Sequence, residues 1–219
     1  MTTDIRALII GGNRFSFHRF DRMGPLLEET VTSIGVNADL TTDRDTLTDL
    51  DGYDVIVDYT TDSTLSDEQL DGLLSFVEAG GGYAGVHCAS DLTATVDGHR
   101  DEPVPELRDM IGGHFLRHPS QTTFAVKVAY SHHPVSADLD DFQVWDEPYV
   151  VDYDDDVTVL ARMDHPEVGD APVSWVTEYG DGRVFYSSLG HDYPAHVNDG
   201  AQALLQNGVR WAAGGPPDE

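Results

Sequence analysis

The chain has 219 residues, 40% of them hydrophobic, which is enough to build one well-buried domain. It carries 12 lysines and arginines against 40 aspartates and glutamates, for a formal net charge of −28. This charge excludes nucleic acids and anionic membrane surfaces as partners, because no basic stripe is present to contact phosphates.

The acidic residues are spread among apolar runs along the whole chain, which predicts a solvated acidic shell on a folded protein. Repulsion within such a shell destabilises the compact state in dilute buffer. Molar salt, in which the Debye length is about 3 Å, screens that repulsion. We therefore predict a protein from a halophilic organism.

Cys88 is the only cysteine, so the disulfide frameworks of secreted proteins are excluded. The first residues run directly into a strand-like segment, and no apolar run approaches the roughly 18 residues that a membrane helix requires. These features predict a cytoplasmic protein. Residues 1–214 are expected to form a single domain, followed by a frayed tail at 215–219.

Short apolar runs alternate with longer amphipathic segments in the first half of the chain, which is the pattern of βαβ units. Strands are predicted at 5–10, 36–40, 53–59 and 83–86. Helices are predicted at 23–34 and directly after Ser66, an N-cap residue followed by acidic first-turn residues. This order predicts an α/β fold with a mostly parallel central sheet and helices on both faces.

Strand candidates follow one another more closely in the second half of the chain, which predicts an antiparallel C-terminal edge of the sheet. They lie at 124–128, 143–151, 157–161, 173–177 and 183–187. A final helix is predicted at 198–213, where a Gly-Gly-Pro-Pro segment ends it.

The segment from Gly80 to Ser90 has the form of a strand that enters a sharp turn and then a helix, as in nucleophile elbows. His87 holds the elbow position, and Cys88 falls one residue late, where its side chain points back toward the helix or core. A thiol nucleophile is therefore disfavoured. An imidazole at the carboxyl end of a parallel strand can bind a metal ion or transfer a proton, and a purely structural histidine remains the alternative.

Six short motifs stand out for their glycine, histidine and aromatic residues. They are Gly80–Ala89, Ile111–Pro119, His133-Pro134, Asp146–Tyr149, Pro172–Trp175 and Tyr179–Asp192. In this order they resemble the trehalose-utilisation (ThuA-like) family over nearly the whole chain. The resemblance implies the flavodoxin-like sheet of the class I glutamine amidotransferase-like superfamily. His87 then takes the place of the catalytic cysteine of amidotransferases, and His191 that of their catalytic histidine.

Residue types and the resemblance together indicate a polar site. We expect His87, Glu147 and His191 to be catalytic, with Glu147 as the acid–base group because partial burial can hold a carboxylate near neutrality. Candidates for substrate binding are Asn13, His18, Asp91 and Tyr149. Candidate metal ligands are His87, His118, His133 and His191. These residue types suit a divalent metal, zinc first, although no spacing matches a metal-binding signature such as HExxH.

The resemblance implies a role in sugar catabolism, as a metal-assisted or acid–base hydrolase or lyase acting on glycosides. The implied substrate is trehalose, a related disaccharide or a 3-keto form of either. Two alternatives stay open: an amidotransferase- or peptidase-like hydrolase that uses Cys88, and a non-catalytic sugar-binding or regulatory module. No nucleotide cofactor is expected, because the dinucleotide fingerprint and the P-loop are both absent. Apolar edge strands permit a homo-oligomer.

Overall fold

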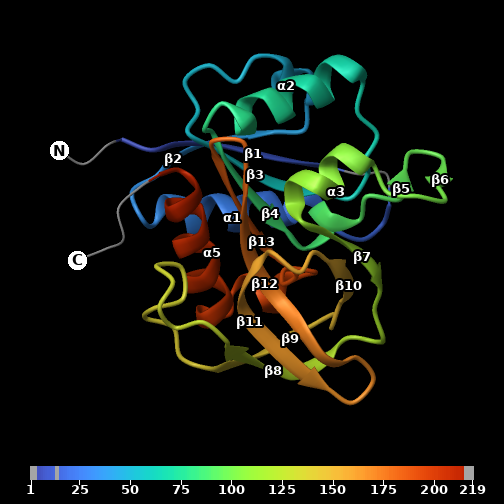
Figure 1. The fold of residues 1–219 in the computed structure, drawn as a ribbon, viewed down its shortest axis with the longest axis vertical. Helices are drawn as coiled ribbons and strands as arrows, with labels where there is room; N and C mark the ends of the chain where they lie inside the picture. Colours follow the sequence, from blue (N-terminus) through green and yellow to red (C-terminus); the bar gives the residue numbers. More distant parts are fainter. Residues whose placement is uncertain (1–3, 13–14, 215–219) are drawn as a thin grey trace.

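A mixed β-sheet forms the framework of the computed structural model, which describes residues 4–12 and 15–214 (Figure 1). Within these residues the central sheet has nine strands. In spatial order they are β2 (Asn37–Thr41), β1 (Arg6–Gly12), β3 (Val55–Thr60), β4 (Gly82–Val86), β13 (Gly182–Ser187), β12 (Gly169–Tyr179), β11 (Thr158–His165), β8 (Thr122–Val128) and β9 (Phe142–Asp146). The first five are parallel, and each later strand is antiparallel to the one before it. The predicted fold class, with its antiparallel C-terminal edge, is confirmed.

Helices cover both faces of this sheet, as predicted. They are α1 (Phe20–Thr32), α2 (Asp67–Glu78), α3 (Pro105–Ile111), α4 (Tyr193–His196) and α5 (Asp199–Ala212), with the 3-10 turns η1 (Arg44–Thr48) and η2 (His87–Ser90). Alternate residues of a strand point to opposite faces. Ile9 of β1 therefore lies in the core beneath α1 and α5, and Leu8 in the core beneath α2. In the described part of the chain, no helix is long and apolar enough to cross a membrane.

The start of α2 follows from a local signal in the sequence. Ser66 Oγ accepts a hydrogen bond from the backbone N–H of Gln69 at 3.2 Å, and Gln69 Oε1 accepts one from the backbone N–H of Ser66 at 2.9 Å. This reciprocal capping box satisfies two N–H groups that the first helical turn leaves without a partner.

The prediction of one continuous strand at 143–151 is wrong. β9 ends at Asp146, and β10 (Val150–Tyr153) pairs instead with β7 (Gly113–Arg117) in a separate two-stranded sheet. Pro148 lies between them and has no N–H group to donate to a strand ladder, so it favours an interruption there. A further small sheet pairs β5 (Ala94–Thr95) with β6 (Gly98–His99).

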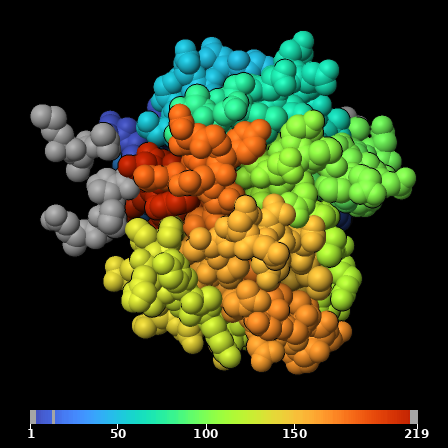
Figure 2. Space-filling model, in the orientation of Figure 1, coloured from blue at the N-terminus to red at the C-terminus, as the bar shows by residue number. Residues whose placement is uncertain are grey.

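The topology creates one edge suited to a ligand site. The parallel strands β1, β3, β4 and β13 all end at this edge, and the strand order 2-1-3-4-13 reverses direction between β1 and β3. In open α/β sheets, ligands bind outside the carboxyl ends of the strands at such a switch point. In the space-filling view, the antiparallel extension is coloured yellow to orange and forms the lower part of the molecule (Figure 2).

Candidate metal centre

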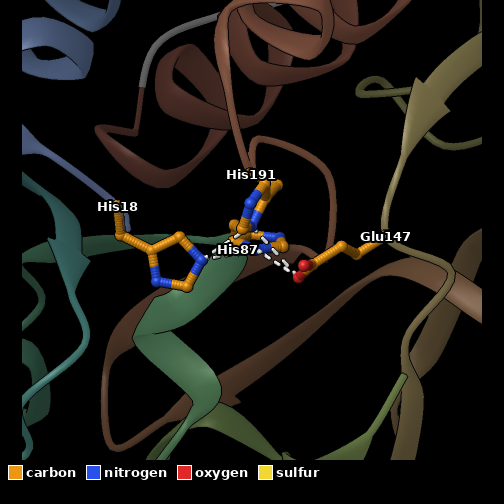
Figure 3. Close-up of side chains that lie close together, drawn as sticks. All are labelled: His18, His87, Glu147 and His191. Atoms are coloured by element: carbon orange, nitrogen blue, oxygen red, sulfur yellow. Dashed lines mark hydrogen bonds and ion pairs between the residues drawn. The ribbon is translucent and has the colours of Figure 1, made fainter. Parts of the chain in front are cut away.

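Three histidines and one glutamate converge at the carboxyl edge of the sheet (Figure 3). His18 lies in the loop after β1, His87 follows β4, His191 follows β13, and Glu147 follows β9. One donor atom from each lies within 4.8 Å of the donor atoms of the other three. The residues are far apart in sequence and meet because the ends of their strands share one edge.

Two of these histidines have an unusual backbone conformation. The φ angle is 47° at His87 and 50° at His18, in the left-handed region that non-glycine residues rarely adopt. At His87 this conformation lets β4 turn directly into η2, which is the elbow that the sequence predicts. The His87 carbonyl accepts a hydrogen bond from the hydroxyl of Tyr186 at 2.8 Å, which holds the turn. Such strain persists where the surrounding structure supports it, and it is common at functional sites.

The donor atoms lie close to one another. His18 Nε2 is 2.9 Å from His191 Nδ1 and 3.1 Å from His87 Nε2. Glu147 Oε2 is 3.1 Å from His191 Nδ1 and 3.5 Å from His87 Nε2. The side chains of His87 and Glu147 are 0% and 9% exposed, so these polar atoms face one another and are largely shielded from water.

Neighbouring groups orient the imidazoles. His87 Nδ1 donates a hydrogen bond to the Ser188 carbonyl at 2.7 Å, so Nε2 is the ring nitrogen that faces the centre. His18 Nδ1 is 3.0 Å from Thr61 Oγ1, so its Nε2 likewise faces inward. The buried Tyr149 hydroxyl lies 2.8 Å from His87 Nε2. Partners of this kind set the orientation and basicity of histidine ligands in metal sites.

Asp146 joins two of the contributing segments, and its role was not predicted from the sequence. Its carboxylate is fully buried and accepts hydrogen bonds from the backbone N–H groups of Gly190 at 2.7 Å, His191 at 3.1 Å and Glu147 at 2.8 Å. The feature of the sequence that could have indicated Asp146 is its place directly before Glu147 in the Asp-Glu-Pro-Tyr motif. Asp146 therefore holds the segments that carry His191 and Glu147 against each other.

The charge states of His18 and Glu147 favour binding a cation. Burial, together with the charges of His87 and His191, lowers the pKa of His18 to about 2, so its ring is neutral near pH 7. Burial alone would raise the pKa of Glu147, but interactions with the neighbouring imidazoles of His191 and His87 outweigh it and hold that pKa well below its usual range. Glu147 is therefore a carboxylate, and the prediction that it is poised near neutrality is wrong. Burial opposes protonation of His191, yet Glu147 raises the pKa of that imidazole.

Comparison with known families decides the assignment of the chain. A family model described as "Trehalose utilisation", ThuA, matches residues 6–212. The chain belongs to the ThuA family. A search of curated proteins found no match.

Solved structures agree with this fold. A ThuA-like protein from Parabacteroides merdae superposes with a TM-score of 0.83 at 19% identity, over 99% of this chain and 93% of that one. A second, from Bacteroides uniformis, has a TM-score of 0.75 at 23% identity, over 99% and 96% of the two chains. A β-galactosidase from Rahnella sp. R3 matches over 98% of this chain but only 32% of its own, with a TM-score of 0.74 at 17% identity. At these identities the likeness shows the fold alone.

Two other predicted site residues of this ThuA chain lie at the centre. Tyr149 contacts His87, and His118 Nε2 is 3.6 Å from Glu147 Oε2. His118 Nδ1 donates to the Pro119 carbonyl at 2.8 Å. The His118 side chain is 36% exposed, so it borders the four-residue cluster on the solvent side.

His133 does not reach the centre, so its prediction as a ligand of the same ion is wrong. Its ring packs against Trp211, with the centroids 5.1 Å apart. The Trp211 carbonyl accepts a hydrogen bond from Arg183 near the start of β13, whereas His191 follows the end of that strand. His133 therefore lies toward the opposite edge of the sheet. The His133-Pro134 motif could not predict the position of His133, because the loop between β8 and β9 is positioned only by tertiary packing.

Asp91, another substrate-binding candidate, is not part of the cluster. Asp91 Oδ1 accepts hydrogen bonds from the Thr93 hydroxyl at 3.1 Å and the Ala94 N–H at 3.3 Å, which stabilise the turn after η2. Asn13 lies outside the described residues.

The alternative that uses Cys88 as a nucleophile finds little support. The Cys88 side chain is fully buried, and burial raises the pKa of its thiol well above the usual value. A thiolate is the reactive form of cysteine. His87 occupies the elbow, and Cys88 lies in the core beneath α1 and α5.

His196 is a buried histidine behind the centre. Its ring packs against Tyr59, with the centroids 5.5 Å apart, and among the described residues no group hydrogen-bonds its buried Nε2. Burial, together with the charges of His87 and His191, lowers the pKa of His196 from 6.5 to about 4. Between these two pH values the unfolded chain binds a proton that the folded chain does not. The free energy of unfolding therefore decreases as the pH falls through this window. His196 contributes on the order of 3 kcal/mol to that decrease.

We expect His196→Gln to flatten this dependence, because glutamine does not titrate. The measurement is the free energy of unfolding by urea at pH 7 and pH 4.5, in molar salt with a chelator present. His132→Gln, at an exposed loop position, serves as the control and should keep the wild-type slope. Equal slopes in His196→Gln and the wild type would contradict the assignment.

Proposed function

We propose that the protein is a metal-assisted enzyme of sugar catabolism, a hydrolase or lyase acting on glycosides such as trehalose, a related disaccharide or a 3-keto form of either. The observation that carries the proposal is the convergence of three imidazoles and one carboxylate at the ligand-binding edge of the sheet. Membership of the ThuA family supports the sugar substrate, because the family description is trehalose utilisation.

The donor set fits a divalent first-row metal ion. Imidazole nitrogen and carboxylate oxygen are ligands of zinc and of its neighbours in the series, and His18, His87, Glu147 and His191 would hold the ion. A bound ion supplies a Lewis acid that polarises a carbonyl oxygen or lowers the pKa of a bound water.

Residues of the chain position both the sugar substrate and the imidazole rings of the cluster. Tyr149 and His118 border the cluster, where the hydroxyl and the imidazole can hydrogen-bond a sugar oxygen. Ser188 and Thr61 hold the rings of His87 and His18, and the buried environment of the cluster strengthens its electrostatic interactions.

Turnover tests the enzymatic proposal. Protein freed of metal with a chelator and reloaded with one divalent ion at a time is incubated with trehalose, with 3-ketotrehalose and with non-sugar esters. The expected result is product from a sugar substrate only, which disappears in His191→Ala. Tight sugar binding without product, in both the loaded and the metal-free protein, would instead favour a sugar-binding module.

The acidic composition supports a cytoplasm of high ionic strength as the place of action. Raising the salt concentration from 0.1 to 1 M shortens the Debye length from about 10 to about 3 Å, which weakens repulsion among the surface carboxylates. With 40 acidic side chains against 12 basic ones, we expect the unfolding midpoint to rise with KCl concentration. Differential scanning calorimetry checks this, with sucrose as an uncharged control. A midpoint that rises equally in sucrose would contradict charge screening as the cause.

Analytical ultracentrifugation across the same salt series tests the proposal that the chain forms a homo-oligomer.

A further inference from the structure

The four donor atoms of the centre are joined by a closed ring of short separations. Around the ring they are 3.1 Å from His87 to His18, 2.9 Å from His18 to His191, 3.1 Å from His191 to Glu147 and 3.5 Å from Glu147 to His87. These are hydrogen-bond and ion-pair distances, and they set how far the donor atoms would have to move to bind one common ion.

Simple geometry relates separation to angle. Two donors that bind one ion at about 2.1 Å lie about 3.0 Å apart at a right angle and about 3.4 Å apart at a tetrahedral angle. Three of the four separations, 2.9, 3.1 and 3.1 Å, are close to the right-angle value, and only the 3.5 Å separation is nearer the tetrahedral one. A tetrahedral ion would therefore require these three separations to lengthen by about 0.3–0.5 Å, whereas a right-angle arrangement requires almost no movement.

A second argument comes from the number of protein ligands. Catalytic zinc sites have three protein ligands and keep a fourth position for water or substrate, whereas sites with four protein ligands are closed and structural. Four donors around a tetrahedral ion would leave no position for a substrate. Hydrogen bonds hold these donors in place and oppose displacement of a ligand. Thr61 holds the ring of His18, Ser188 holds the ring of His87, and Asp146 holds the backbone of His191.

We propose that the centre binds a six-coordinate divalent ion of the manganese, iron, cobalt or nickel type, rather than four-coordinate zinc. The inference deepens the proposed function and rests on it, because it takes these four side chains as ligands. Imidazole suits zinc, copper, iron and nickel, and carboxylate suits manganese, so the donor types allow this group and the number of donors is what separates it from zinc.

The coordination number has a consequence for the substrate class. Four of six positions are filled by protein, and two are left for oxygen donors. A sugar carbonyl or hydroxyl and a water molecule, or two sugar oxygens, can then bind the ion together. Oxygen atoms on neighbouring carbons of a sugar can fill both positions where these are adjacent on the ion.

Titration of the metal-free protein with Co²⁺ alone tests the proposal, because cobalt reports its own coordination number in visible absorption. Six-coordinate Co²⁺ absorbs weakly, and four-coordinate Co²⁺ absorbs several-fold more strongly. We expect one bound ion per chain with weak bands. Their shift on addition of a vicinal diol, and not of a matched mono-alcohol, would support two open positions.

The other outcomes separate the two proposals. Stoichiometric binding with intense bands would overturn six-coordination and leave the metal site standing. Absence of binding to the wild type, or binding that survives in His191→Gln, would overturn the proposed metal function itself. His133→Gln is the matched control and should bind cobalt like the wild type, because its ring packs against Trp211. Circular dichroism of each variant shows whether loss of binding reflects loss of folding.

Discussion

Replacement of His87 by alanine is expected to remove stoichiometric metal binding and to lower turnover of a sugar substrate by at least about 100-fold. Substitution of partners that only orient ligands already weakens metal sites by about 10–100-fold, and loss of a ligand should cost more. His87 is the most buried of the four candidate ligands, and its Nε2 faces the donor atoms of His18 and Glu147. Elemental analysis of protein purified in molar salt, together with initial rates, measures both effects.

Cys88→Ala is the matched control for this variant. Cys88 is the next residue and is fully buried, but it points into the core beneath α1 and α5. We expect its metal content and turnover to equal those of the wild type. Retention of metal by His87→Ala would show that the ion, if bound, lies elsewhere. Loss of activity in Cys88→Ala, with metal retained and the protein folded, would revive the amidotransferase- or peptidase-like alternative.

Asp146→Asn is expected to lower the free energy of unfolding by about 3 kcal/mol and to weaken metal binding by about 10–100-fold. The buried carboxylate accepts three backbone N–H groups, and asparagine replaces one acceptor oxygen with an NH₂ group that cannot accept them. The segments that carry His191 and Glu147 then lose their common anchor. Urea denaturation measures the first effect, and competition with a chromophoric chelator measures the second.

Asp152→Asn provides the comparison for that change. Asp152 also pairs with Arg108 and lies 3.6 Å from His114 Nδ1, but its side chain is 54% exposed. Exposed ion pairs contribute at most about 1 kcal/mol, so this variant should lose little stability and no metal affinity. An Asp146→Asn protein that is less stable but binds metal normally would show that Asp146 stabilises the fold without positioning the ligands.

Much of the centre could be predicted because its residues lie at the ends of recognisable strands. His87 follows a glycine-rich buried strand and His191 follows another, and both are in the cluster. His18 was expected to bind substrate and instead contributes a donor atom, since the position of a long loop after β1 depends on contacts such as that with Thr61. His133 has a similar local sequence signal to His118, yet only His118 borders the site.

The sequence by itself determined the α/β class, the elbow at His87 and the N-cap of α2, because hydrophobic periodicity, glycine positions and cap residues act over a few neighbours. Only the tertiary structure decided which polar residues meet. The pairing of β10 with β7, the buried carboxylate of Asp146 and the approach of Glu147 to His191 depend on segments more than 30 residues apart. Their encounter is set by strand order and packing, which no local pattern encodes.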